Sequence, residues 1–259
     1  MKPQDKFKHR NTLYNRRKEL FIAFCVLIFE SLNYPFIKMA LGGSSPFLFL
    51  SIRFWLLALI FMPFSKIRNI KIGPLFQFAL IFNVAHYGFN YLSFNYMSPA
   101  TIGLFQYLQV PLLWMMVHKK LFMLFFIMLG AILCILDLNY TGLIGCTLAL
   151  FSCFSWALGQ MTQKKEEYTV PTFVFFTSLL SAPFFTALCF LTHESFNFAK
   201  THPEKVLLLL IYQICVLGVC KGIWANLSYK EGRSIHTTFI CILKPICVAI
   251  LSWILCTNN

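Results

Sequence analysis

Charged and polar side chains stand inside long apolar runs of this sequence. Glu30 interrupts the run at 20–41, and Asn33 follows it one turn later on the same face of a helix. Lys244 stands in the middle of the last apolar run, directly before Pro245. A charge at the centre of a bilayer costs about 2.5–3.5 kcal/mol, so such a residue usually faces a cavity or a partner. Two interpretations of Glu30 stay open: a role in a polar cavity, or a carboxylate satisfied by Asn, Ser or Lys from a neighbouring helix.

The deep charges are mostly basic. Arg53 lies about seven residues into the second apolar run, and Lys221 lies in the inner third of the eighth. Lys221 can reach the interface by snorkelling, whereas Lys244 is too deep to do so easily. Because Glu30 alone opposes these cations at depth, a shared cavity would be cationic or mixed. This balance favours anionic or zwitterionic solutes, and it makes Glu30 the best candidate for a coupled proton site.

Uncharged polar residues recur at helical spacing. Asn83, His86 and Asn90 stand at i, i+3 and i+7 and predict one polar stripe, and Gln106 and Gln109 predict another. Such stripes either hold helices together or line an aqueous cavity, and His86 is read either as a packed hydrogen-bonding residue or as a proton relay. We predict a substrate or ion pathway with no catalytic residue, metal or cofactor; its members are Glu30, Asn33, Arg53, Asn83, His86, Asn90, Gln106, Lys221 and Lys244. Pro111 and Pro245 remove backbone hydrogen bonds inside apolar runs and are the predicted hinges.

The elements that position these residues are predicted to be membrane-spanning helices. The 259 residues are 58% hydrophobic and only 12% charged, against roughly 25% charged in soluble domains. In lipid a helix satisfies its own backbone hydrogen bonds, and a span needs about 20 apolar residues. The fold class is therefore an all-α, polytopic helical membrane protein. Nine spans are predicted, at 20–40, 47–64, 74–94, 100–117, 121–138, 142–162, 171–192, 205–227 and 235–256. The ten cysteines lie in apolar stretches without a Cys-x-x-Cys pair, so neither disulfides nor a zinc site are indicated.

The basic residues alternate between the two sides of these spans. Sixteen of the 22 Lys and Arg residues fall in the tail or in every second connection, and the other connections hold only Lys200 and Lys205. By the positive-inside rule, the N-terminus is cytoplasmic and the protein lies in the inner membrane. The net charge of +13 is then an orientation signal, and we expect no nucleic-acid partner.

A weak internal repeat divides the chain. Residues 92–94 followed by Pro111 resemble residues 227–229 followed by Pro245. The offset of about 125 to 135 residues predicts a basic tail at 1–19, a first repeat of about five spans at 20–138 and a second of about four spans at 142–256. An odd number of spans in the first repeat inverts the second, as in many secondary transporters.

From about residue 20 to 256, the sequence resembles the EamA family of the drug/metabolite transporter superfamily. Residues 30–38 are similar to the family's Trp-Gly-Ser-Asn-Phe…Lys segment, and Ser45-Pro46 and Arg53-Phe54 follow in order. Residues 92–111 resemble the family's aromatic and small-residue helix pair, and residues 156–165 resemble the opening of its second half. Two departures stand out: Glu30-Ser31 replaces the usual Trp-Gly, and the chain ends after nine spans where the family has ten.

The resemblance implies a secondary transporter that moves a small anionic or zwitterionic metabolite, such as an amino acid or a nucleotide-derived compound, by alternating access. The alternative is a truncated, non-transporting EamA-like membrane protein, because the last family span is missing. The chain has no Gly-x-x-x-x-Gly-Lys-Ser/Thr loop for ATP and no clustered carboxylates for membrane enzyme chemistry. We therefore predict that the protein is not an enzyme. The expected partners are a small-molecule substrate and the lipid bilayer; the oligomeric state, a homodimer included, stays open.

Overall fold

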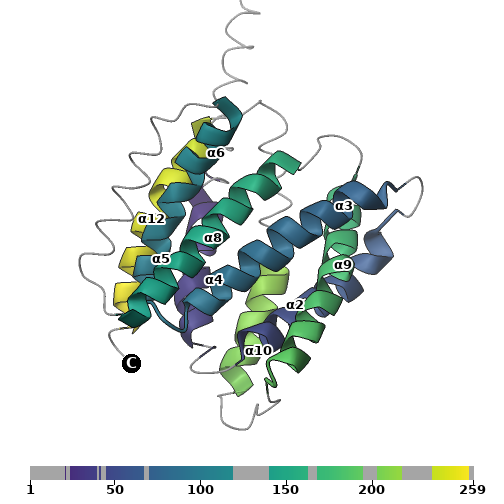
Figure 1. The fold of residues 1–259 in the computed structure, drawn as a ribbon, viewed down its shortest axis with the longest axis horizontal. Helices are drawn as coiled ribbons and strands as arrows, with labels where there is room; N and C mark the ends of the chain where they lie inside the picture. Colours follow the sequence, from purple (N-terminus) through teal and green to yellow (C-terminus); the bar gives the residue numbers. More distant parts are fainter. Residues whose placement is uncertain are drawn as a thin grey trace, which may run out of the picture.

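The computed structural model describes residues 21, 24–39, 41, 45–66, 70–118, 140–162, 168–194, 203–217 and 235–256. All regular secondary structure in these ranges is helical, and Figure 1 shows the helices as one bundle. Four helical stretches are long and apolar enough to cross a membrane, at Pro46–Phe64, Ile72–Ser93, Gly142–Thr162 and Val170–Leu191. The predicted fold class, an all-α polytopic membrane protein, is confirmed. The count of nine spans stays a prediction, and the expected span at 121–138 lies outside the described residues.

The described helices begin and end close to the predicted span limits. The first helix occupies 24–39. The others are α2 (Pro46–Phe61) with a 3₁₀ turn η1 (Met62–Phe64), α3 (Ile72–Phe78), η2 (Ala79–Tyr87), α4 (Gly88–Ser93), α5 (Pro99–Phe105), η3 (Gln106–Leu108), α6 (Gln109–His118), α8 (Tyr140–Thr162), α9 (Val170–Leu191), α10 (Pro203–Ile211), η5 (Tyr212–Leu217) and α12 (Ile235–Cys256).

Local sequence explains where α5 starts. Ser98 has extended backbone angles, and its side chain accepts a hydrogen bond of 3.1 Å from the backbone N–H of Thr101. Pro99 takes the first helical position, where its missing N–H costs nothing. Ser at the cap and Pro at the first position are the residues that helix starts favour. The tight turn at 94–97 therefore ends one span and starts the next.

Helices α2 and α9 form the most extensive helix pair on one flank of the bundle (Figure 1). Phe54 of α2 stacks on Phe185 of α9, with ring centroids 5.4 Å apart and planes 6° from parallel. The hydroxyl groups of Ser51 and Thr186 lie 2.7 Å apart across the same interface. Small buried residues such as Ala182 let the two backbones approach closely, as interfaces between membrane helices require.

The other flank is built from α5, α6, α8 and α12 (Figure 1). Gly103 of α5 faces Val248 of α12 with no room for a side chain, because a Cβ at Gly103 would lie 2.7 Å from Val248 Cγ1. Segment η2 packs against α8, and the first helix meets η5, where the Phe36 and Tyr212 rings lie 5.1 Å apart. The middle of the bundle is thus bordered by helices from both predicted repeats.

Helix ends that were predicted to share a side of the membrane lie together. At one end, the backbone N–H of Lys66 donates to Thr172 Oγ1 at 2.9 Å. At the other, the backbone N–H of Leu48 donates to the Glu194 carboxylate at 2.9 Å, so α2 and α9 run antiparallel. Lys38, at the end of the first helix, donates to the carbonyl oxygen of Phe94 after α4. These contacts agree with the predicted alternation of the spans.

Besides the 3₁₀ turn η1 at the end of α2, three described stretches depart from regular α-helix. The segments η2 and η5 are π-helical, and η3 is a 3₁₀ turn inside the predicted fourth span. The η3 turn ends at Leu108, just ahead of Pro111, whose ring would clash with the carbonyl of Tyr107 in a regular α-helix. The proline therefore accounts for the irregularity there.

Candidate functional site

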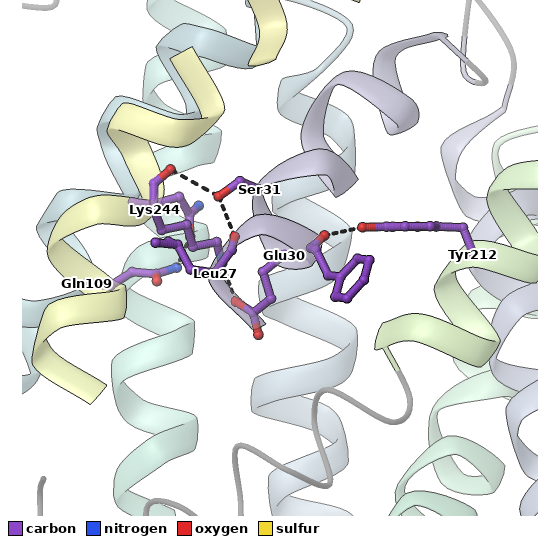
Figure 2. A network of polar contacts seen from close by, with 8 residues as sticks. Leu27, Glu30, Ser31, Gln109, Tyr212 and Lys244 are labelled. Atoms are coloured by element: carbon purple, nitrogen blue, oxygen red, sulfur yellow. Dashed lines mark hydrogen bonds and ion pairs between the residues drawn. The ribbon is translucent and has the colours of Figure 1, made fainter. Parts of the chain in front are cut away.

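An ion pair joins the first helix to α12 near the middle of both. Lys244 Nζ donates to Glu30 Oε2 at 2.9 Å. Figure 2 shows the two side chains reaching toward each other between the helices. The Lys244 side chain is 19% exposed and the Glu30 side chain 22%. The opposite charge stabilises each group in an otherwise apolar bundle.

Three neighbours surround this pair. Ser31 is fully buried; its hydroxyl donates to Leu27 O at 2.7 Å and lies 3.4 Å from the carbonyl oxygen of Lys244. The Tyr34 ring centroid lies 5.4 Å from Lys244 Nζ, within the range of a cation–π contact. The Gln109 side chain extends from α6 toward the same ion pair (Figure 2). Three helices therefore contribute polar or aromatic groups to one place.

A second polar cluster surrounds Arg53. Its Nη1 donates to Tyr91 Oη at 3.3 Å, and its guanidinium carbon lies 4.6 Å from the centroid of the Tyr87 ring. Gln213 of η5 donates to the same Tyr91 oxygen and, at 2.8 Å, to Asn33 Oδ1. We call Arg53, Tyr91, Gln213 and Asn33 the arginine cluster. It lies near the ion pair because Asn33 is one turn from Glu30 on the first helix.

The predicted stripe of Asn83, His86 and Asn90 is buried, but its members face different neighbours. Asn83 Nδ2 donates to the carbonyl oxygen of Thr177 in α9 at 3.2 Å. His86 Nδ1 lies 2.8 Å from the hydroxyl oxygen of Ser152 in α8. The single stripe assumed α-helical spacing, whereas Ala79–Tyr87 is a π-helix with wider turns. The contacts of His86 are those of a packed hydrogen-bonding residue.

The remaining predicted residues have separate surroundings. Gln106 and Gln109 hydrogen-bond each other, and Gln106 Nε2 is buried without an acceptor among the described residues. Asn90 is buried, and its Oδ1 likewise has no donor there. Pro245 lies inside the continuous helix α12, whereas Pro111 follows the η3 turn. Lys221 lies outside the described residues.

Sequence reasoning missed two polar residues. Gln213 falls inside the predicted span at 205–227 and was not among the predicted pathway residues, although one amide in an apolar span is itself a signal of an interhelical bond. Glu194 gave no sequence signal, since it follows α9 in an exposed-looking connection. Its carboxylate caps the start of α2, where Ser45 makes no side-chain cap. Burial raises the pKa of Glu194, although the backbone N–H groups of Leu48 and Phe47 favour its charged form.

Part of the chain is similar in sequence to known transporters. Residues 143–259 match the EamA-like transporter family. The resemblance predicted from the sequence is thereby confirmed for residues 143–259, which include α9, α10, α12 and most of α8, with Gln213 and Lys244. The chain is also similar to the uncharacterized transporter YvbV of Bacillus subtilis, with 29% identity over 166 residues, which is 58% of this chain.

The chain aligns with 54% of the length of YvbV, so it spans about half of that relative. No solved structure matches the chain significantly. The family and this relative support a membrane transporter in general and, indirectly, speak against an enzyme.

Proposed function

We propose that this protein is a secondary transporter that moves a small anionic or zwitterionic metabolite by alternating access. The observation that carries the proposal is a set of polar bonds at mid-bundle that link the two predicted repeats. Lys244 of the second repeat binds Glu30 of the first, and Gln213 of the second binds Asn33 of the first. Polar bonds across a moving interface can break and re-form as two halves rock around a central site.

The helix pairing supports two inverted repeats at 20–138 and 142–256. The π-helix η2 starts at Ala79 and the π-helix η5 at Tyr212, an offset of 133 residues. Segment η2, in the third span of the first repeat, packs on α8, the first helix of the second. Segment η5, in the third span of the second repeat, bonds the first helix of the first. A pseudo-two-fold axis produces this kind of reciprocal pairing.

The sign of the interior charge supports the substrate class. Because Glu30 and Lys244 neutralise each other, Arg53 leaves the described interior with a net positive charge. A solute with a negative group would cancel that charge as it enters, whereas an organic cation would add to it. The same argument gives Glu30 a second role: a proton on its carboxylate would remove the attraction to Lys244 and loosen the link between the repeats.

The proposed pathway keeps the predicted residues and adds Gln213 and Tyr91. Pro111 and Pro245 serve as hinges, since each lies in a helix of the α5, α6 and α12 flank. The orientation proposed with it is a cytoplasmic N-terminus in the inner membrane, which the distribution of Lys and Arg supports.

Transport by the purified full chain in proteoliposomes tests this function. The panel consists of labelled amino acids, nucleosides, S-adenosylmethionine and organic anions, measured by exchange and by accumulation under a proton gradient. We expect at least one anionic or zwitterionic solute to move, and Glu30→Gln to abolish proton-driven accumulation. The control is Lys66→Gln, which removes an exposed cation after α2.

The results separate the two interpretations of the chain. Accumulation that survives Glu30→Gln would rule out the coupling role of Glu30. If folded, inserted protein moved no member of the panel, the non-transporting EamA-like membrane protein would be the better description.

A further inference from the structure

Arg53 is the largest side chain that the described bundle buries almost completely, with 1% exposure. Among the described residues, one hydrogen bond holds it, from Nη1 to Tyr91 Oη, and its Nε has no acceptor. The Tyr87 ring lies against the guanidinium and supplies only a quadrupole. The arginine is therefore placed and oriented, but its donors are not used up.

No described carboxylate balances this charge. The described acidic residues are Glu30, Glu194 and Glu204: the first binds Lys244, the second caps α2, and the third is exposed at the start of α10. A guanidinium stays charged inside a protein. A buried charge without a counter-charge destabilises the folded protein, whereas an apolar side chain at the same position would carry no such desolvation cost. A ligand that brings the missing negative charge accounts for keeping the arginine.

The hydrogen bonds around Tyr91 leave its hydroxyl group as a second hydrogen-bond donor beside Arg53. Tyr91 Oη accepts hydrogen bonds from Arg53 and from Gln213, so both its lone pairs are engaged and its own O–H proton is left to donate. Asn33 Oδ1 accepts a hydrogen bond of 2.8 Å from the Gln213 side-chain amide. The phenol is thus fixed from two directions. Arg53 Nε–H and Tyr91 O–H are two donors around one positive charge.

We propose that Arg53 and Tyr91, held in place by Gln213 and Asn33, form the subsite that receives the carboxylate of the transported solute. This inference rests on the proposed function and narrows its substrate class to carboxylates. A carboxylate accepts two hydrogen bonds in one plane, which matches the planar guanidinium. It also carries one negative charge, which a single arginine neutralises. A phosphate dianion would need a second cation, and the Lys244 charge is already balanced by Glu30.

Most of the arginine cluster is buried, which fits a subsite that opens and closes during alternating access. Gln213 and Tyr91 are both fully buried, so solvent does not reach these side chains in this structure. The cluster is assembled from the first helix, α2, α4 and η5, which belong to both predicted repeats. Rocking one repeat against the other would separate Gln213 from Asn33 and Tyr91 and would open the arginine to one side of the membrane.

Ligand binding to the detergent-purified full chain tests the subsite without relying on transport. The probes are matched pairs of similar shape, benzoate with benzamide and acetate with acetamide, together with inorganic phosphate and chloride as other anions. The readout is the shift of the thermal unfolding midpoint as each probe is titrated. We expect the carboxylates to raise the midpoint and their amides, chloride and phosphate to raise it much less.

Four variants locate the effect. Arg53→Gln should weaken carboxylate binding about 10- to 100-fold, since hydrogen bonds to charged groups contribute about 1.5–3 kcal/mol. Arg53→Lys should recover part of the affinity because it keeps the charge but not the planar fork. Tyr91→Phe removes one donor with little change of volume and provides the test if Arg53→Gln does not fold. Lys66→Gln, which removes the same charge at an exposed position, should bind like the wild type.

Each outcome separates the subsite from the transport function. Carboxylate binding that depends on Arg53, in a chain that transports nothing, would support the subsite and contradict the transporter. Transport of a solute without a carboxylate, with benzoate binding no better than benzamide, would overturn the subsite and leave the transporter standing. Equal binding by the wild type, Arg53→Gln and Tyr91→Phe would also overturn it.

Discussion

At the residue scale, the ion pair of Glu30 and Lys244 shows how opposite charges make each other tolerable inside an apolar bundle. Their nitrogen and oxygen lie 2.9 Å apart, and both side chains are about one-fifth exposed. Removing one partner leaves the other charge in a poorly solvated place, whereas removing both leaves two neutral groups. Stability and transport should therefore respond differently to single and double substitutions.

We predict that Glu30→Gln and Lys244→Gln will each destabilise the protein by about 2–4 kcal/mol, because one charge loses its counter-charge. The double variant should be more stable than either single variant. Thermal unfolding in detergent measures the three changes as a double-mutant cycle. Additive effects of the two substitutions would show that the pair does not couple the first helix to α12.

Glu194 provides a pH-dependent contribution outside the spans. Its folded pKa is raised above the unfolded value of about 4.3, so this group favours the folded state when protonated. The contribution is fully present below the unfolded pKa and is lost as the pH rises through the folded pKa. Compared with Glu194→Gln, which keeps an acceptor oxygen for Leu48, the wild type should gain stability as the pH falls from 7 toward 4. Unfolding midpoints of both proteins across this range measure the difference; a relative loss of wild-type stability at low pH would contradict the prediction.

At the scale of elements, irregular helices place the polar groups. His86 lies in the π-helix η2 and Gln213 in the π-helix η5, and each bonds a helix of the other predicted repeat. A π-helical turn widens the spacing around the axis and is frequent at functional sites. The η3 turn near Pro111 also interrupts the α-helical spacing, but as a 3₁₀ turn it is tighter. The arginine cluster therefore combines side chains of regular helices, the first helix, α2 and α4, with Gln213 of the π-helix η5.

The contact between α5 and α12 depends on a glycine. A Cβ at Gly103 would lie 2.7 Å and 2.9 Å from two atoms of Val248, so Gly103→Ala should push the helices apart and cost about 1–3 kcal/mol. Adding Val248→Ala should restore part of this loss by making room. Gly88→Ala is the control, because its Cβ would meet only Phe185 Cε1 at an ordinary 3.7 Å. Unfolding midpoints measure all four proteins; equal effects of Gly103→Ala and Gly88→Ala would contradict the close approach.

At the scale of the whole molecule, the helix ends divide into two groups on opposite sides. Lys66 meets Thr172 at one side, and Leu48 meets Glu194 at the other. In the predicted topology most Lys and Arg residues fall on the Lys66 side, so the positive-inside rule predicts that this side faces the cytoplasm. The contacts between helix ends thus agree with the predicted relative orientation of α2 and α9, and which side faces the cytoplasm stays a prediction from the charge distribution.

Epitope tags test this orientation in intact and permeabilised cells. Tags inserted at 66–70 or at the N-terminus should bind antibody only after permeabilisation. A tag at 195–200 should bind in intact cells, because α9 ends on the opposite side from Lys66. Labelling of the 66–70 tag in intact cells would show that the chain is inserted the other way round.

The sequence by itself determined the class of fold and the limits of most described helices. Long apolar runs allow little else in lipid, so 235–256 and 142–162 could be predicted to within two residues of α12 and α8. It also marked Glu30, Lys244 and Arg53, because a charge in an apolar run is visible without any structure.

Only the tertiary structure decided which of these residues meet. The pairing of Glu30 with Lys244 spans 214 residues, and that of Asn33 with Gln213 spans 180, distances over which no sequence periodicity carries information. The split of Asn83 from His86 depended on the π-helix η2, which tertiary contacts stabilise and residue spacing does not reveal. Arg53 looked like other deep cations in the sequence; its lack of a described counter-charge emerged only once the neighbouring helices were in place, because burial and pairing are properties of packed surfaces.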